Sequence, residues 1–295
     1  MTDPLPDWLS PIIVKELRQG LRSRAFVTLF AVLQIAMLFC LMAAAENSES
    51  SMGRQTASAF FWMVSGGMLL AALPLRGINA LSGEIKGNTL EILSLTPLTS
   101  WRIVMGKWAA LFLQGVLMVI TLLPYVVLRY FVGGIDLVGE LRILGTMVAG
   151  CAVLTAFGVG LSPILHRTVG RILLGVGVVF AMQFLGSVLM ALRFGRGTGI
   201  DPEFLILATL FLTPLVVLEA IELAVRLLAP VGENTAWRQR LLALAIIGVS
   251  GIIGWITGEA KVGTILAAIL TAPVLLGALL GDAPLIPTLY EPPGF

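Results

Sequence analysis

The sequence predicts an all-α, polytopic membrane protein built as a bundle of six to eight transmembrane helices. Of its 295 residues, 58% are apolar and only 12% are charged, whereas a soluble domain is about half apolar and about a quarter charged. The apolar residues form continuous runs close to the about 20 residues that a helix needs to cross a bilayer, without the alternation typical of strands. Because lipid offers the backbone no hydrogen-bond partners, such runs are expected to be helical. This composition excludes a soluble globule, a disordered chain and a nucleic-acid-binding protein.

Eight apolar segments follow one another along the chain. They are residues 25–45, 57–75, 108–128, 143–165, 172–192, 204–225, 241–257 and 262–281. The first is too long for the apolar part of a signal peptide, and we interpret it as the first span. The last two are joined by a very short connection around Gly258, so they form either two spans or a re-entrant hairpin. The predicted organisation is a cytoplasmic N-terminus (1–24), a transmembrane domain (25–281) and a cytoplasmic tail (282–295).

The basic residues predict the orientation of the chain. With the N-terminus inside, the inner segments hold 13 of the 19 Lys and Arg residues and the outer segments hold 6. Inner loops of membrane proteins are enriched in basic residues. We therefore expect both ends of the chain on the cytoplasmic side, short outer loops, and two longer cytoplasmic pieces, residues 1–24 and 76–107.

The N-terminal piece predicts an amphipathic helix that lies in the membrane interface. Ser10 and Pro11 suit the N-cap and the first helical position. One side then carries Ile13, Leu17 and Leu21, and the other carries Lys15, Arg18, Gln19 and Arg22. Basic residues favour the anionic inner leaflet, and we expect a sharp turn into the first span near residues 23–25. The alternative is a basic flank that only sets the topology.

The loop over residues 76–107 predicts a short helix on the cytoplasmic side. Asn88 can cap it, Glu91 stands three residues later as in a capping box, and Pro97 ends it. A helix over residues 89–96 is about 12 Å long, too short to span and too apolar to remain in water alone. It either docks on a cytosolic partner or packs as a re-entrant loop on its own bundle. A second helix is expected to restart at Thr99 or Ser100 and to enter the third span.

Two segments resemble the permeases of bacterial ABC-2 type transporters. Residues 11–24 are similar to the family's cytoplasmic elbow segment, and residues 82–107 to its coupling loop. The matching positions of the loop are Glu84, Gly87, Thr89, Leu90, Glu91, Leu93, Thr96 and Pro97, with Asn88 as an insertion between Gly87 and Thr89. Family members usually have six spans, so the two C-terminal segments are additional.

The resemblance implies a function and a set of partners. In this family the loop contributes a coupling helix that sits in a groove of a separate ATP-binding subunit. Two permease chains, identical or paralogous, pair with two such subunits in the bacterial inner membrane. ATP and Mg²⁺ are then expected on the partner subunit, and no cofactor or metal on this chain.

Motifs for chemistry are missing from the sequence. It contains no phosphate-binding loop of the G-x-x-x-x-G-K-[ST] type, and its one histidine, His166, has no nearby carboxylate. Cys40 and Cys151 both lie inside apolar runs and have no metal-binding spacing. The chain is therefore expected to be a transport subunit and not an enzyme.

A few polar residues inside the spans are candidates for a gate or a substrate pathway. Ionisable residues at membrane depth are functional candidates by default. Glu219 and Glu222 lie toward the cytoplasmic end of the sixth span, where Glu222 could instead pair with Arg226 four residues later. Gln34 and Gln183 lie in the middle of their spans. We expect them either to line a polar path or to bond helices together.

We therefore expect the membrane-spanning permease subunit of an ABC-2 type exporter. Its substrate is not readable from the sequence. One alternative is an ATP-independent secondary transporter or channel, in which an inverted repeat or a charged relay at the midplane would be expected. The other is a non-transporting membrane scaffold.

Overall fold

The fold is entirely helical over the residues described by the computed structural model, which are 11–46, 51–78, 80, 100–133, 136–162, 202–228 and 236–279. Within them, six helical stretches are long and apolar enough to cross a membrane. The prediction of an all-α polytopic bundle is thereby confirmed. The expected fifth span (172–192), most of the loop over residues 76–107 and the tail (282–295) lie outside the described residues.

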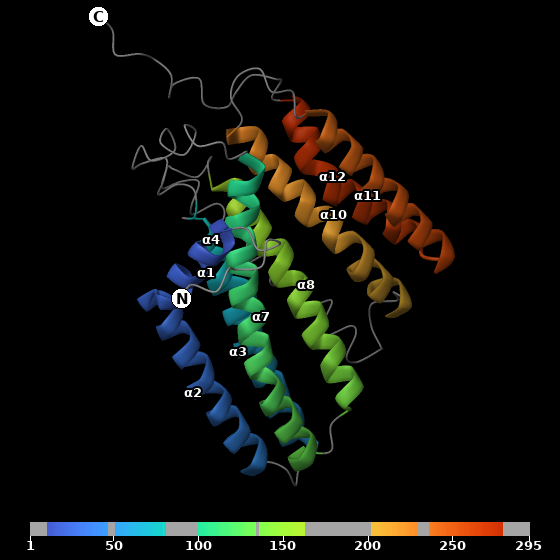
Figure 1. The fold of residues 1–295 in the computed structure, drawn as a ribbon. Coiled ribbons are helices and arrows are strands. Elements are labelled where there is room, and N and C mark those ends of the chain that lie inside the picture. Colours follow the sequence, from blue (N-terminus) through green and yellow to red (C-terminus); the bar gives the residue numbers. More distant parts are fainter. Residues whose placement is uncertain are drawn as a thin grey trace, which may run out of the picture.

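The first two helices are α1 (Pro11–Arg22) and α2 (Arg24–Glu46), and the chain bends sharply between them (Figure 1). Ser23 explains the bend, because its hydroxyl serves both helices. Its Oγ donates to the carbonyl of Gly20 (2.7 Å) and accepts from the backbone N–H of Phe26 (3.2 Å). It thus closes α1 and caps α2, at the place where the sequence predicts a turn.

The second span is one continuous helical stretch that changes its winding. It runs through α3 (Ser51–Gly66), the π-helical segment η1 (Gly67–Ala72) and α4 (Leu73–Gly77). Pro74 has no N–H to donate to the carbonyl four residues earlier, and the wide turns of η1 lie beside this missing bond. The apolar pattern of this span gives no sign of η1.

The next three described helices are longer than the apolar runs that predict them. They are α7 (Ser100–Gly133), α8 (Leu137–Leu161) and α10 (Pro202–Leu228). The predicted restart at residue 99 or 100 is confirmed. With 34 residues, α7 is about 51 Å long, well beyond the about 30 Å of a hydrocarbon core. The connection between α7 and α8, expected over residues 129–142, is much shorter because both helices extend into it and Asp136 caps α8 through the N–H of Val138 (3.1 Å).

The C-terminal segments form an antiparallel helical hairpin of α11 (Ala236–Ile256) and α12 (Ala260–Leu279). Gly258 makes the tight turn with φ of +77°, a conformation that favours glycine. The two helices approach closely, because a Cβ on Gly263 would lie only 2.7 Å from the carbonyl oxygen of Ser250. Of the two helices, α11 belongs to the six stretches that are long and apolar enough to cross a membrane, whereas the apolar part of α12, Lys261–Thr271, is shorter.

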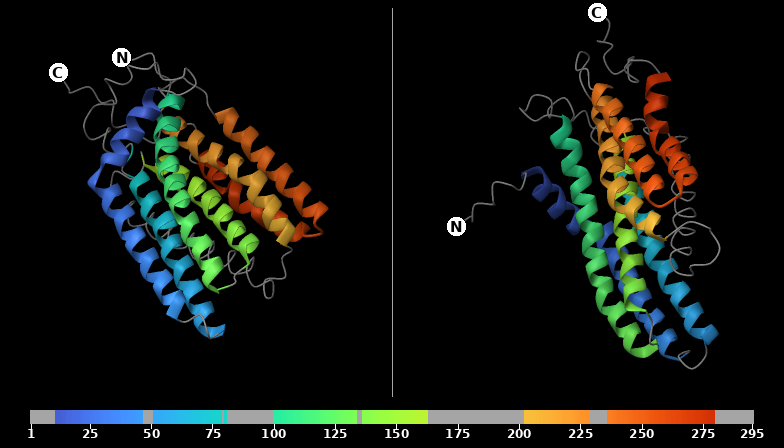
Figure 2. Two further views of the ribbon diagram at one scale, coloured as in Figure 1. Left: turned by 60° about the horizontal axis from the view of Figure 1, so that its bottom comes forward. Right: turned by 90° about the vertical axis from the view of Figure 1, so that its right-hand side faces the viewer.

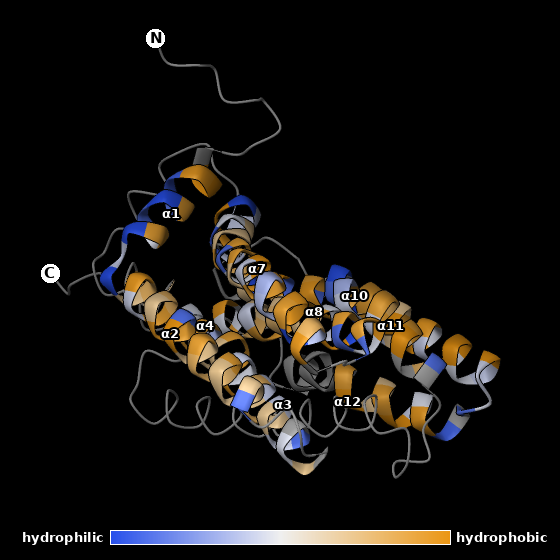
Figure 3. Ribbon diagram, turned by 90° about the horizontal axis from the view of Figure 1, so that it is seen from below, coloured by the Kyte–Doolittle hydropathy of each residue, from blue (hydrophilic) through white to orange (hydrophobic). Residues whose placement is uncertain are grey.

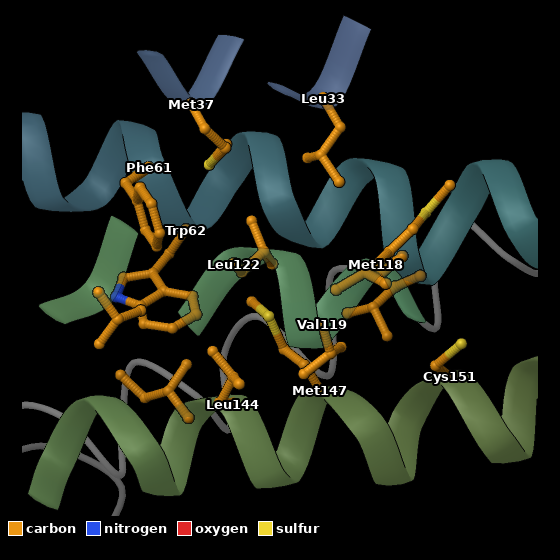
Figure 4. Packing of buried hydrophobic residues seen from close by; sticks show 14 of the residues in the cluster. Leu33, Met37, Phe61, Trp62, Met118, Val119, Leu122, Leu144, Met147 and Cys151 are labelled. Atoms are coloured by element: carbon orange, nitrogen blue, oxygen red, sulfur yellow. The ribbon is translucent and has the colours of Figure 1, made fainter. Parts of the chain in front are cut away.

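The helices stand in a row, with α2 at one side of the bundle and the α11–α12 hairpin at the other (Figures 1 and 2). Three apolar clusters join them in turn. The first lies between α2, the second span, α7 and α8, and Figure 4 shows its centre with Leu33, Met37, Phe61, Trp62, Met118, Leu122, Leu144 and Met147. The second joins α7, α8 and α10, and the third joins α10 to the hairpin.

The outward faces of the bundle are apolar as well. Large exposed hydrophobic side chains include Phe39 and Met42 of α2 and Ile252 and Trp255 of α11. Figure 3 shows hydrophobic colouring along the bundle helices and a strongly hydrophilic side on α1. Such faces suit contact with lipid, so the protein is a multi-pass membrane protein.

Candidate functional site at the junction of α1, α4 and α7

The predicted coupling loop is framed by two helix ends that the structure describes. The matching residues themselves, Glu84, Gly87, Asn88, Thr89, Leu90, Glu91, Leu93, Thr96 and Pro97, lie outside the described residues. The chain enters this loop from α4 and leaves it into α7. Both ends bond to the first helix or to its bend, and we call this meeting point the junction.

Arg76 of α4 is the centre of the junction. Its Nη1 donates to Oε1 of Gln114 on α7 (2.8 Å), and its Nη2 donates to Oγ of Ser23 (3.0 Å). The guanidinium also lies 5.8 Å from the ring centroid of Phe26. One side chain therefore ties the end of the second span to the third span and to the bend between α1 and α2.

An ion pair connects α1 to the other arm of the loop. Nζ of Lys107 on α7 lies 3.3 Å from Oε1 of Glu16 on α1. The lysine side chain is 8% exposed and the glutamate side chain 27%. This pair is far better shielded than the exposed ion pairs that contribute about 0–1 kcal/mol.

Close packing holds α1 directly against α7. A Cβ on Gly106 of α7 would lie 2.7 Å from Cγ2 of Ile12, and a Cβ on Gly20 of α1 would meet the side-chain amide of Gln114. The opposite side of α1 is exposed, and it carries the predicted basic residues Lys15, Arg18 and Arg22. The amphipathic helix is therefore present, while its place in the membrane interface stays a prediction.

Helix α8 holds the end of α4 from the other side. The Ser162 hydroxyl donates to the carbonyl of Ile78 (2.6 Å), just before the loop begins. A Cβ on Gly158 would lie 2.6 Å from the carbonyl oxygen of Pro74 and 3.5 Å from Cα of Gly77. The two helices therefore cross here almost backbone to backbone.

The predicted acidic pair on α10 is buried, but its partner differs from the expected one. Oε1 of Glu222 lies 3.7 Å from Nη1 of Arg238 on α11, whereas Arg226 donates to Oε1 of Gln239 (3.2 Å). The expected Glu222–Arg226 pair is wrong among the described residues, because α11 presents an arginine and an amide to the same surface of α10. Both carboxylate oxygens of Glu219 lie buried, with no hydrogen-bond partner in the described part of the chain.

The glutamine that the structure describes in the first span bonds two helices together. Nε2 of Gln34 on α2 donates to Oγ1 of Thr121 on α7 (2.9 Å). This geometry fits the expectation of helix–helix bonding at membrane depth. Gln183 lies outside the described residues.

Sequence reasoning missed a buried ion pair at the far end of α7. Nη1 of Arg129 lies 3.1 Å from Oε2 of Glu140, its Nη2 donates to Oγ of Ser58 (2.6 Å), and its guanidinium lies 4.3 Å from the ring centroid of Phe61. Both charged side chains are at most 4% exposed. Arg129 stands 22 residues after Lys107, about 33 Å along the helix. Opposite charges at the facing ends of consecutive spans are the signal that could have revealed it.

The geometry defines a class of protein and no more than that. The chain matches no protein-family model and no curated protein. In the described part of the chain, no three His, Cys, Asp or Glu side chains gather as a metal site would need. The fold and the junction thus define a multi-pass helical membrane protein in which α4 and α7 are bonded to α1 and to the bend that follows it.

Proposed function

We propose that this chain is the permease subunit of an ABC-2 type exporter in a bacterial inner membrane, with its N-terminus in the cytoplasm. ATP and Mg²⁺ bind to a separate ATP-binding subunit, and a second permease chain, identical or paralogous, completes the transporter. Two kinds of support meet here. The residues of the loop resemble the family's coupling segment. Of the helices on either side of that loop, α7 is bonded to α1 and α4 is bonded to the bend after it.

The junction carries the proposal because it provides a mechanical connection. A displacement of the loop acts on Arg76 at its entry and on Lys107 at its exit. These side chains hold Ser23 and Glu16, so α1 moves together with α4 and α7. Rigid helices that shift as units are a general means of converting a local displacement into a rearrangement of a bundle. The partner's ATP-driven movement would in this way reach the first span through the bend at Ser23.

Isolation of the complex tests the proposal. The tagged chain is extracted from its native membranes in a mild detergent, and co-purifying proteins are identified by mass spectrometry. We expect a protein with a phosphate-binding loop in stoichiometric amount. Replacing Leu90 and Leu93 by serine should abolish this association, because the short helix then loses its apolar face. Arg18→Gln on the exposed side of α1 is the matched control and should leave it intact.

A second variant separates docking from coupling. Arg76→Gln leaves the loop sequence unchanged but removes the charged link between α4, Gln114 and Ser23. We expect this variant to retain the ATP-binding subunit and to lose the coupling between ATP hydrolysis and transport. A deletion of residues 84–98 that still binds the ATP-binding subunit would refute the assigned coupling role.

One observation favours an ATP-independent secondary transporter as the second candidate. Glu219 is a buried carboxyl group in a candidate span, and such groups serve as relays in ion-coupled transporters. Transport by the chain alone in vesicles, driven by an ion gradient and without an ATP-binding subunit, would establish this alternative.

A further inference from the structure

Two carboxyl groups on α10 are buried with most of their oxygens unused. Glu219 is 1% exposed and Glu222 is 5% exposed. Among the residues that the structure describes, neither oxygen of Glu219 has a hydrogen-bond partner, and neither does Oε2 of Glu222. Residues three apart lie on one face of a helix, so these free acceptor atoms gather on one side of α10.

This arrangement is costly for ionised carboxylates unless a positive charge can approach them. An ionised carboxylate buried without a partner costs several kcal/mol, and buried polar groups in native proteins are nearly always hydrogen-bonded. Glu219 stands seven residues before Arg226, about 10 Å along the helix from that end of the candidate span. Its neighbours in sequence, Val217, Ala220 and Ile221, are buried among apolar side chains. The unpartnered carboxylate oxygens therefore lie among apolar side chains, about two helical turns from the end of the span.

The protein's own cation at this place is weakly held. The guanidinium of Arg238 reaches Glu222 only at 3.7 Å, and its side chain is 49% exposed. It lies 5.7 Å from the ring centroid of Trp237, which is exposed too. The other nearby arginine, Arg226, is bonded to Gln239. Arg238 thus stands at an open edge of the acidic pair and can swing away without breaking a short bond.

We propose that Glu219 and Glu222 bind the charged nitrogen of an organic cation, a primary ammonium or a guanidinium, whose apolar part lies among the side chains of α10 and α11. An ammonium group has three N–H donors, and ionised carboxylates are its strongest acceptors. Two carboxylates supply only part of the about six to eight oxygens that a calcium ion takes, whereas they can accept all the N–H groups of one ammonium. Arg238 occupies Glu222 when the site is empty and competes with the ligand. Binding itself does not need an ATP-binding subunit, although its meaning as a cargo site rests on the proposed transport function.

Calorimetric titration of the purified full chain in a neutral maltoside detergent tests the site. The probe is hexylammonium chloride at constant pH and ionic strength, with hexanol as the uncharged probe of equal chain length. We expect saturable binding of hexylammonium and none of hexanol. The double variant Glu219→Gln, Glu222→Gln should weaken binding at least tenfold. Glu203→Gln, at the other end of α10, is the matched control and should bind like the parent chain.

A third variant distinguishes a binding site from a purely structural pair. Arg238→Gln removes the internal competitor, so we expect it to bind hexylammonium several-fold more tightly, which no structural role would produce. Equal affinity of the double Gln variant and the parent chain, or no preference for hexylammonium over hexanol, would overturn the proposal. Weaker binding in Arg238→Gln would also overturn it, since Arg238 would then support the ligand.

The same titration in lipid nanodiscs distinguishes two sources of the ammonium group. If added phosphatidylethanolamine displaces hexylammonium, the natural occupant is a lipid headgroup. If it does not, the occupant is a free amphiphilic cation, and the site is a cargo site. The double variant leaves the loop over residues 84–98 unchanged. A failure to bind hexylammonium is therefore distinguishable from a failure to co-purify an ATP-binding subunit.

Discussion

Substituting Gly158 by alanine should loosen the contact between α4 and α8 beside the junction. The added Cβ would lie 2.6 Å from the carbonyl oxygen of Pro74, whereas ordinary contacts begin near 3.4 Å. The two helices must therefore separate by about 0.8 Å, taking the difference of these distances. The obstacle is backbone and cannot rotate away. Overpacking of this kind typically costs about 1–3 kcal/mol.

A second glycine of α8 isolates this steric cost. A Cβ on Gly145 would meet no atom within 4 Å, so Gly145→Ala changes only the helix preference, which favours alanine by about 1 kcal/mol. Gly158→Ala has the same gain, and the difference between the two variants equals the steric cost alone. Reversible unfolding in mixed detergent micelles, followed by circular dichroism, measures both free energies. If Gly158→Ala is as stable as Gly145→Ala, the close crossing of α4 and α8 is refuted.

Three further predictions concern the first helix and the first span. Glu16→Gln should destabilise the chain by about 1–3 kcal/mol because Lys107 loses a shielded partner. The swapped pair Glu16→Lys, Lys107→Glu should recover part of this loss in the same unfolding assay. No recovery would argue against the ion pair. A double-mutant cycle of Gln34→Leu and Thr121→Val should give a coupling of about 0.6 kcal/mol, typical of such bonds in membranes, and a value near zero would contradict the bond. Arg18→Cys should react with an impermeant maleimide in inside-out vesicles, and labelling of intact cells instead would place α1 on the outer side.

Local signals made much of the fold predictable. Long apolar runs define the spans because lipid leaves a helix as the only way to satisfy their backbone. Pro11 marks the start of α1, and Ser23 ends it because a serine hydroxyl can cap the following helix. Gly258 marks the last turn, where the backbone is left-handed. These features depend on residues within a few positions of one another.

The candidate site depends on contacts that no local pattern encodes. Arg76 bonds to Ser23, 53 positions earlier, and to Gln114, 38 positions later. Arg226 satisfies the spacing rule for an ion pair with Glu222, yet Arg238 makes the pair, because the position of α11 decides which cation reaches the carboxylate. Tertiary packing, which the single sequence does not specify, selects the partner in each case.

The wide turns of η1 set the rotational phase of the two halves of the second span. Phe61 on one side of Gly67–Ala72 faces the apolar cluster, and Arg76 on the other side meets Ser23 and Gln114. Removing one residue from a helix turns everything beyond it by about 100°. In η1, however, the wide turns hold about one residue more than an α-helix of the same rotation, so a single deletion there would let the segment rewind as α-helix and would leave the Arg76 guanidinium facing both partners. The same deletion in α3 has no wide turn to absorb it, and it would turn Arg76 away from Ser23 and Gln114 and so remove the bonds between the end of the second span and the bend after α1.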